Sequence, residues 1–313
     1  MPVVAVAGGT GKLGRAIVDA LNATKQSTVL VLARESSELK EKEIGSKIVA
    51  VDYGNVANIT EALNIHKVDV LISTVFSVQT NDAELALIEA ADRASGKIRF
   101  ITSSWGIPYT KSMGTRFGPA AHKAEAVAAL EKTSLVFSSV HPGYFLDYFC
   151  MPKVKSYMDP VTTFIDIQNN IAAIPGSGDT PVVFTHTWDV AKFVAEYVNQ
   201  PASEWEKDVF IIGDKITMNE FVAIAEEAKG VKFEIFHDSL DKLNKGEVTE
   251  LPSHPAMYPY FPKTMLQSLF AAFGVFFDNG DFDFNPSKSL HDVFPHTKAR
   301  TVKEVVNAAW KTE

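Results

Sequence analysis

A glycine-rich turn directly after an apolar run is the feature that most restricts how this chain can fold. Residues 3–7 read Val-Val-Ala-Val-Ala, and residues 8–14 read Gly-Gly-Thr-Gly-Lys-Leu-Gly before a helical pattern begins. A turn of this kind between a strand and a helix is typical of the first βα unit of a parallel α/β sheet.

Each glycine in this turn has a physical use. Gly8 permits the tight turn, Gly11 lets the backbone approach a pyrophosphate, and Gly14 lets the helix pack closely on the sheet. The helix N-terminus adds free N–H groups and the positive end of its dipole. A turn that merely joins a strand to a helix is the alternative, and the pattern that follows disfavours it. We therefore expect a dinucleotide site that contains Gly8, Thr10, Gly11, Lys12, Leu13 and Gly14.

The first half of the chain alternates strand and helix patterns, which predicts an α/β fold with a doubly wound parallel sheet of the Rossmann type. The expected strands are Val3–Ala7, Thr28–Ala33, Lys47–Val51, Asp69–Ser73, Ile98–Thr102 and Leu135–Val140. The expected helices between them are Lys12–Leu21, Val56–Leu63, Asp82–Ala94 and Pro119–Glu131.

The pattern changes after about residue 142, where aromatic residues become dense. We expect residues 1–150 to form the dinucleotide-binding domain. Residues 151–313 are expected to form a smaller part that is interleaved with the sheet and not independent. Asp189 is expected to cap a helix over residues 190–198, and Thr217 with Glu220 fits a capping box.

Composition excludes several classes of protein. The chain has 313 residues, a net charge of −8 and one cysteine, Cys150, so it can form no internal disulfide and no thiolate zinc cluster. The acidic balance argues against a nucleic-acid or anionic-membrane surface, and the longest apolar segment is too short for a membrane span. The histidines lack metal-ligand spacing. We expect a cytoplasmic protein with no metal site and no nucleic-acid or membrane partner.

The second strand ends in Arg34, about 20 residues past the turn, where an NAD-binding protein usually has a carboxylate. A guanidinium there suits a 2′-phosphate and favours NADP(H). Two alternatives remain. The neighbouring Glu35 could bind the ribose of NAD(H) instead, and Arg34 could be a solvated surface residue.

Several further segments resemble one family. They are the run Arg99-Phe100-Ile101-Thr102-Ser103-Ser104-Trp105-Gly106, the helix with His122-Lys123-Ala124-Glu125, the run His141-Pro142-Gly143-Tyr144-Phe145 and the triplet Asp189-Val190-Ala191. With the glycine turn and Arg34, they resemble the isoflavone-reductase-like and NmrA-like group of atypical short-chain dehydrogenases. That group includes plant phenylcoumaran benzylic ether and pinoresinol–lariciresinol reductases and many fungal relatives. The first of these runs is similar to the family's Arg-Phe-Ile-Pro-Ser-Glu-Phe-Gly pattern. In this chain Thr102 replaces the proline, Ser104 the glutamate and Trp105 the second phenylalanine.

The resemblance implies NADPH as cofactor and a smaller part that covers the substrate. It also implies which residues approach the cofactor at the strand ends: Asp52, Ser73, Thr74, Val75, Thr102, Ser103, Lys123, Pro142 and Gly143.

The resemblance implies that Lys123 is catalytic, since no tyrosine here has a lysine four residues later as in ordinary short-chain dehydrogenases. The helical pattern gives partial support, because Lys123 shares a face with Val127 and has no acidic neighbour one turn away. A partly buried ammonium has a lowered pKa. The alternative is a lysine that extends to water. Ser103 and Ser104 are expected to orient the substrate or a water, and His122, offset by about 100°, to point away.

Aromatic residues are expected to line a pocket for a flat aromatic or heterocyclic substrate, although each one alone fits the core equally well. The candidates are Phe76, Trp105, Tyr144, Phe149, Tyr157, Tyr258 and Phe261.

Three functions remain open from the sequence. The first is an NADPH-dependent reductase of secondary metabolism, with Lys123 as proton donor or relay. The second is an isomerase or cyclisation enzyme that uses the cofactor without net reduction. The third is a non-catalytic NADP(H) sensor with a protein partner, which the presence of Lys123 disfavours. A homodimer also remains open.

Overall fold

A computed structural model describes residues 1–76 and 78–311. Its contacts divide the chain into two compact units. The first comprises Met1–His141, Thr187–Ile211 and Lys288–Lys298, and the second comprises Pro142–His186, Ile212–Ser287 and Ala299–Glu313. The prediction sets one boundary at residue 150, whereas here two later segments pack within the first unit.

The first unit is built on a parallel sheet that has seven strands within the described residues. The strands are β1 (Val3–Ala7), β2 (Thr28–Ala33), β3 (Lys47–Ala50), β4 (Val70–Ser73), β5 (Arg99–Ile101), β6 (Val136–His141) and β11 (Asp208–Phe210). Their order is β11-β6-β5-β4-β1-β2-β3, and all pairings are parallel. The strand order reverses between β1 and β4, which is where doubly wound sheets bind ligands.

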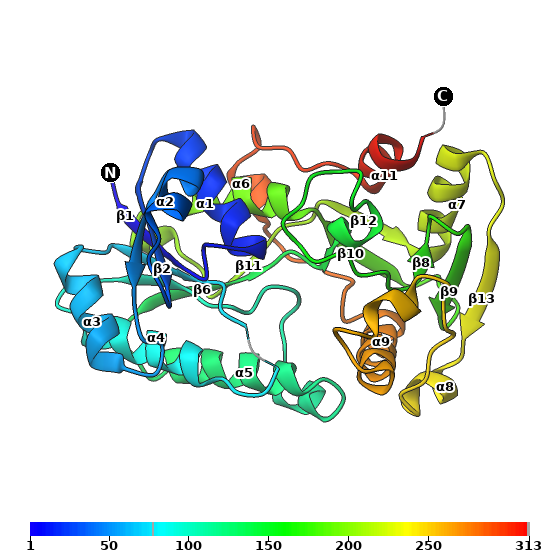
Figure 1. Ribbon diagram of the computed structural model, residues 1–313, viewed down its shortest axis with the longest axis horizontal. Helices are drawn as coiled ribbons and strands as arrows, with labels where there is room; N and C mark the ends of the chain where they lie inside the picture. The colour runs from blue at the N-terminus through cyan, green and yellow to red at the C-terminus, as the bar shows by residue number, and fades with distance from the viewer. Residues whose placement is uncertain (77, 312–313) are drawn as a thin grey trace. The chain divides into compact units, whose positions relative to one another are not determined.

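Helices cover both faces of this sheet (Figure 1). The helices α3 (Val56–Ile65), α4 (Asp82–Arg93) and α5 (Gly118–Leu130) form one layer, and α1 (Lys12–Thr24) packs on α6 (Thr187–Tyr197) on the other face. The unit also contains α2 (Glu38–Ile44), α10 (Leu290–Val293) and the 3₁₀ turns η1 (Lys111–Thr115) and η3 (Ala202–Glu204).

The predicted doubly wound α/β fold is confirmed, with strand and helix ends within a few residues of the expected ones. Apolar strands buried on both faces produce a continuous signal, so this part of the sequence is informative. The prediction that Asp189 caps a helix is wrong, because α6 begins at Thr187 and Asp189 lies buried in its first turn. The short α2, capped by the Ser37 side chain, was not predicted.

The second unit contains two small sheets and a helical part. Its strands form the orders β12-β10-β7 and β13-β9-β8. They are β7 (Tyr144–Phe145), β8 (Ile165–Asp166), β9 (Ile171–Pro175), β10 (Pro181–Thr185), β12 (Asp214–Thr217) and β13 (Glu234–Asp238). The helices are α7 (Met218–Lys229), α8 (Leu240–Asn244), α9 (Lys263–Asp278) and α11 (Val302–Trp310), with 3₁₀ turns η2 (Leu146–Phe149) and η4 (His254–Met257). The predicted Thr217–Glu220 capping box is present.

Aromatic rings fill the core of the second unit. The Tyr144 ring lies between 5.1 and 6.4 Å, centroid to centroid, from those of Phe149, Phe164, Phe184, Phe273, Phe277 and Phe282. Four of these six pairs are edge-to-face, and such pairs contribute about 0.5–1.5 kcal/mol each beyond the apolar area they bury. Much of the aromatic density in the second half of the sequence therefore serves packing.

Among residues 1–76 and 78–311, no helix is both long and apolar enough to cross a membrane.

Candidate active site

The glycine turn joins β1 to α1 under tight steric limits. Gly8 has a φ of +78°, a conformation that residues with a side chain rarely adopt. A Cβ on Gly14 would lie 2.5 Å from the backbone oxygen of Gly8 and would also clash with the Thr74 hydroxyl. The first helix can therefore approach the sheet only with glycine at position 14.

Gly11 differs, because a Cβ there would meet no atom within 4 Å and would extend into open space. No side chain caps the N-terminus of α1, and no acidic residue lies in its first turn. The first helical residue, Lys12, has a φ of 53°, a strained conformation found often at ligand sites. An open cradle beside an uncapped helix N-terminus fits a phosphate group.

Tyr53, which the sequence analysis did not single out, ties this turn to the neighbouring strand. Its hydroxyl donates to the backbone oxygen of Leu32 at 2.8 Å and accepts from the N–H of Gly8 at 3.3 Å. Burial raises the pKa of Tyr53 to about 12, so the phenol stays neutral and can donate.

Three more of the predicted cofactor residues, Arg34, Asp52 and Thr74, lie at the same carboxyl edge of the sheet. Arg34 is exposed directly after β2, and Asp52 is exposed after β3. The side chain of Thr74 is held by a 2.7 Å hydrogen bond to the backbone oxygen of Ala7. The parallel sheet thus brings together residues that are far apart in the sequence.

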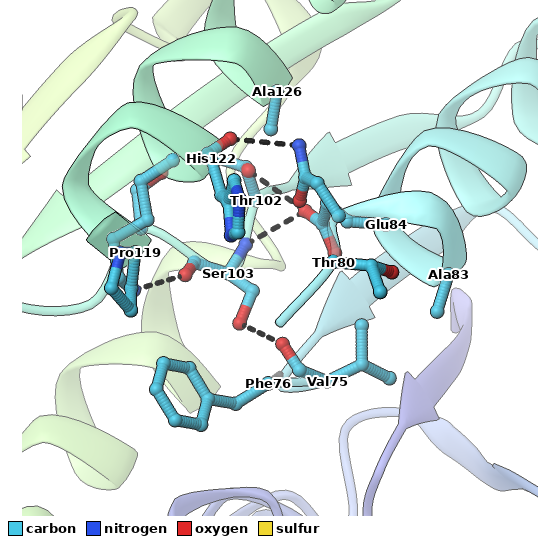
Figure 2. Close-up of a pocket in the computed structure, with 13 residues that line it drawn as sticks. Val75, Phe76, Thr80, Ala83, Glu84, Thr102, Ser103, Pro119, His122 and Ala126 are labelled. Atoms are coloured by element: carbon cyan, nitrogen blue, oxygen red, sulfur yellow. Dashed lines mark hydrogen bonds between the residues drawn. The ribbon is translucent and has the colours of Figure 1, made fainter. Parts of the chain in front are cut away.

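A buried carboxylate, Glu84, links the ends of β4 and β5. It accepts hydrogen bonds from the hydroxyl of Thr102 and, at 2.9 Å, from the N–H of Ser103 (Figure 2). It also accepts one from the hydroxyl of Ser73. The side chains of Ser73 and Thr102 are therefore directed to Glu84, so any contact they make with a cofactor would come from their backbone.

The sequence analysis missed Glu84, although one signal could have found it. Glu84 lies in the first turn of α4 on the face that buries Leu87, Ile88 and Ala91. Carboxylates are almost never fully buried unless they are paired, so a glutamate at an apolar-face position next to strand ends is unusual.

A pocket of about 80 Å³ opens beside this carboxylate (Figure 2). Its walls come from the loop after β4, the start of α4, the end of β5 and one face of α5. The lining includes Val75, Phe76, Asn81, Glu84, Thr102, Ser103, Ser104, His122 and Lys123. The three predicted catalytic residues, Lys123, Ser103 and Ser104, are thus gathered in one place.

Lys123 is half-buried in this pocket, and its amine is fixed in position. The Nζ atom donates to the backbone oxygen of Ser103 at 2.6 Å, and it lies 5.3 Å from the ring centre of Tyr109 and 5.9 Å from that of Phe76. Burial lowers the pKa of Lys123 to about 8, although the charge of Glu84 acts in the opposite direction. An amine with this pKa can exchange a proton near neutral pH.

Two polar atoms of the pocket have no hydrogen-bond partner among the described residues. They are the buried Oγ of Ser104, whose residue is 3% exposed, and the Nδ1 of His122. The prediction that His122 points away from the site is wrong, because its ring lines the same pocket as Lys123 (Figure 2). Buried polar atoms of this kind normally bind water or a ligand.

The predicted substrate residues fall into different environments. Phe76 is 62% exposed at the pocket. Trp105 is buried, and its indole N–H donates to the backbone oxygen of Ser73 at 3.0 Å, so it supports the end of β4.

The remaining aromatic candidates lie in the second unit. Tyr144 and Phe149 are buried in its aromatic core. Tyr157, Tyr258 and Phe261 are half-buried, and the amines of Lys155 and Lys263 lie 5.3 and 5.8 Å from the ring centres of Tyr157 and Tyr258.

Pro142 and Gly143 begin the second unit. Gly143 has a φ of +75°, and a Cβ there would overlap the backbone oxygen of Val183. The close approach of two chain segments therefore explains this glycine.

Known proteins match the chain along nearly its whole length. Oxidoreductase BOA1 of Botryotinia fuckeliana (strain B05.10) is 34% identical over 297 residues, which cover 93% of this chain and 94% of that protein. Phenylcoumaran benzylic ether reductase TP7 of Nicotiana tabacum is 26% identical and covers 96% of each chain.

Solved structures share the fold. Leucoanthocyanidin reductase from Vitis vinifera, solved as a ternary complex, has a TM-score of 0.73 at 21% identity and covers 97% of each chain. AtPrR2 with NADP⁺ and (+)pinoresinol has a TM-score of 0.74 at 22% identity and covers 98% of each. The model of the NmrA-like family matches residues 2–305. The predicted resemblance is confirmed: the chain belongs to the NmrA-like family.

Proposed function

We propose that this protein is an NADP(H)-dependent oxidoreductase that reduces a flat aromatic or heterocyclic small molecule in secondary metabolism. One observation carries the proposal. A half-buried amine, that of Lys123, lies in a pocket at the carboxyl edge of a doubly wound sheet whose first turn is open to a phosphate. The chain matches Oxidoreductase BOA1 at 34% identity, which supports the same activity class.

The residues of the first unit fit an NADP(H) molecule. The turn from Gly8 to Gly14 and the N-terminus of α1 would hold the pyrophosphate, because they offer N–H groups and an uncapped helix dipole. Arg34 would bind the 2′-phosphate through its guanidinium, and Asp52 would approach the adenine side. When bound, the reduced nicotinamide supplies a hydride.

Lys123 would supply the proton. Its ammonium donates a proton to the substrate heteroatom while the hydrogen bond to Ser103 fixes the direction of the amine. Ser104 would bind the substrate or a water, since its buried hydroxyl has no other partner among the described residues.

The aromatic substrate class rests on the pocket and on the relatives. The exposed ring of Phe76 lies beside the Lys123 amine, so a flat ring could pack on Phe76 with its heteroatom toward Lys123. Two relatives, each 26% identical, are named phenylcoumaran benzylic ether reductase and eugenol synthase. Those names support an aromatic substrate for this chain as well.

Two measurements on the purified protein test the proposal. Calorimetry with NADPH and NADH measures binding, and absorbance follows NADPH oxidation with a panel of aromatic ethers, carbonyl compounds and quinones. We expect tight binding of NADPH and oxidation of one NADPH for each product molecule. Binding without turnover would favour a sensor, product without net NADPH loss would favour an isomerase, and no binding of either cofactor would overturn the proposal.

A further inference from the structure

Glu84 is a buried carboxyl group with three hydrogen-bond partners that can donate to it. It is 5% exposed, and its two oxygens accept from the Ser73 hydroxyl, the Thr102 hydroxyl and the Ser103 N–H. The N–H of Ser103 can only donate, so the Glu84 oxygen that it contacts accepts. The Ser73 and Thr102 hydroxyls can both donate to an ionised Glu84.

Ser103 connects this carboxylate to the candidate proton donor. Its N–H donates to Glu84, its backbone oxygen accepts from the Lys123 amine at 2.6 Å, and its own hydroxyl donates to the backbone oxygen of Val75 at 2.6 Å. Glu84 thus fixes the position of Ser103, and the backbone oxygen of Ser103 binds the Lys123 amine. Replacing Glu84 would therefore affect the amine in two ways, through Ser103 and through the loss of the carboxylate charge.

We propose that Glu84 is a positioning residue that keeps Lys123 in its ammonium form, by its negative charge, and directs the amine, by fixing Ser103. The inference rests on the proton-donor role given to Lys123 under the proposed function. Glu84 does not touch the reacting atoms and acts only through Lys123 and Ser103.

Few other charges act on the pair among the described residues. From α4, Glu84 is the one carboxylate whose charge acts on the Lys123 amine. His122 adjoins Lys123 on α5, and the Tyr109 ring faces it from the loop before η1. The charge of Glu84 also acts on Tyr53, which follows β3, and contributes to its raised pKa. Burial raises the pKa of Glu84 above its usual value, and its three hydrogen-bond donors and the charge of Lys123 offset only part of this increase. Loss of Glu84 would leave the amine buried without an opposing charge.

Glu84→Gln tests the proposal, because it keeps the size and one accepting oxygen but removes the charge. Glu89→Gln on the exposed side of the same helix, where Glu89 pairs with Arg93, is the matched control. Competitive acetylation of Lys123 across a pH series, quantified by peptide mass spectrometry, gives the pKa of its amine without any need for turnover.

We expect the pKa of Lys123 to fall by about one unit or more in Glu84→Gln, the effect of losing a nearby opposite charge, and to stay unchanged in Glu89→Gln. At a pH below the pKa, the acetylation rate would rise roughly tenfold. Glu84→Asp, which keeps the charge, is expected to restore most of the native value. An unchanged acetylation profile in folded Glu84→Gln would overturn the inference.

The kinetic readout separates this inference from the proposed function. If Lys123 is the proton donor, the alkaline limb of the pH–rate profile moves to lower pH in Glu84→Gln, in step with acetylation. A shifted acetylation profile with an unchanged pH–rate profile would support the effect of Glu84 on Lys123 and reject the donor role of Lys123.

Should Glu84→Gln fail to fold, Thr102→Val removes one hydrogen-bond donor to the Glu84 carboxylate. It is expected to lower the pKa of Lys123 by a smaller amount, and no change would count against the inference.

Discussion

The amine of Lys123 donates a hydrogen bond to the backbone oxygen of Ser103 at 2.6 Å. This contact joins the middle of a helix, α5, to the end of a strand, β5, and it directs a titratable group into the pocket. A surface lysine would extend toward water instead. The proton transfer proposed for this protein requires the Lys123 amine to lie in the pocket and not in water.

Replacing Lys123 by methionine should remove the proton donor while keeping most of the side-chain volume. We expect turnover to fall by about 100- to 10,000-fold, the usual contribution of general acid catalysis, with NADPH binding retained. Steady-state kinetics and calorimetry measure the two effects. Lys132→Met, an exposed lysine just beyond the same helix, is the control and should behave as the native protein. Full activity in Lys123→Met would reject the donor role.

The rate of reduction should depend on pH through the Lys123 amine. Burial lowers the pKa of this amine to about 8, and only its protonated form can donate. Activity should therefore be present below this value and should be lost as the pH rises through about 8. A pH series of kcat with saturating NADPH measures the limb, and Lys123→Met should lack it. A limb that persists in the variant would belong to another group.

Arg34→Ala should weaken NADPH far more than NADH, because only NADPH carries the 2′-phosphate. Hydrogen bonds to a charged group contribute about 1.5–3 kcal/mol, which corresponds to a loss of roughly 10- to 100-fold in affinity. Calorimetry with both cofactors checks this, with Arg93→Ala on α4 as an exposed-arginine control. Equal losses for NADPH and NADH would show that Arg34 does not select the phosphate.

Replacing Gly14 or Gly11 of the first turn by alanine should affect different properties, stability in one case and cofactor binding in the other. Gly14→Ala forces a clash with the Gly8 backbone and should lower the melting temperature. Gly11→Ala adds a methyl group to open space at an ordinary extended φ of −155°, so it should leave the melting temperature unchanged and weaken NADPH binding. Thermal unfolding and calorimetry distinguish the two. Native affinity in Gly11→Ala would mean that no ligand approaches this turn.

Gly143→Ala should destabilise the protein through its packing. The position has a φ of +75°, and a Cβ there would overlap the Val183 backbone. A residue forced into such a backbone region costs about 1–3 kcal/mol even before the clash is counted. Urea unfolding monitored by circular dichroism measures the loss. A stability equal to that of the native protein would show that the two segments can separate without cost.

Local signals made the sheet and the glycine turn predictable. Apolar strands such as Val3–Ala7 and helices such as Val56–Ile65 carry their periodicity in adjacent residues, so their order along the chain is sufficient to infer a doubly wound sheet. The catalytic role of Lys123 was predicted from the family resemblance, and the helical pattern around it gave only partial support.

Contacts between distant segments were not predictable. The position of Glu84 on the apolar face of its helix marks it as unusual, but the three donors from the ends of β4 and β5 are visible only in the folded chain. His122 enters the pocket beside Lys123, although helical geometry alone turns it away. Tyr144 and Phe149 looked like pocket residues but pack in an aromatic core.

The sequence by itself determined the α/β architecture, the glycine turn and the presence of Lys123, because each depends on residues that are neighbours in the chain. Only the tertiary structure decided which groups surround that lysine. The ionisation of a buried amine depends on charges and donors that the fold brings from other elements. Here those groups are Glu84 on α4 and the backbone of Ser103 after β5.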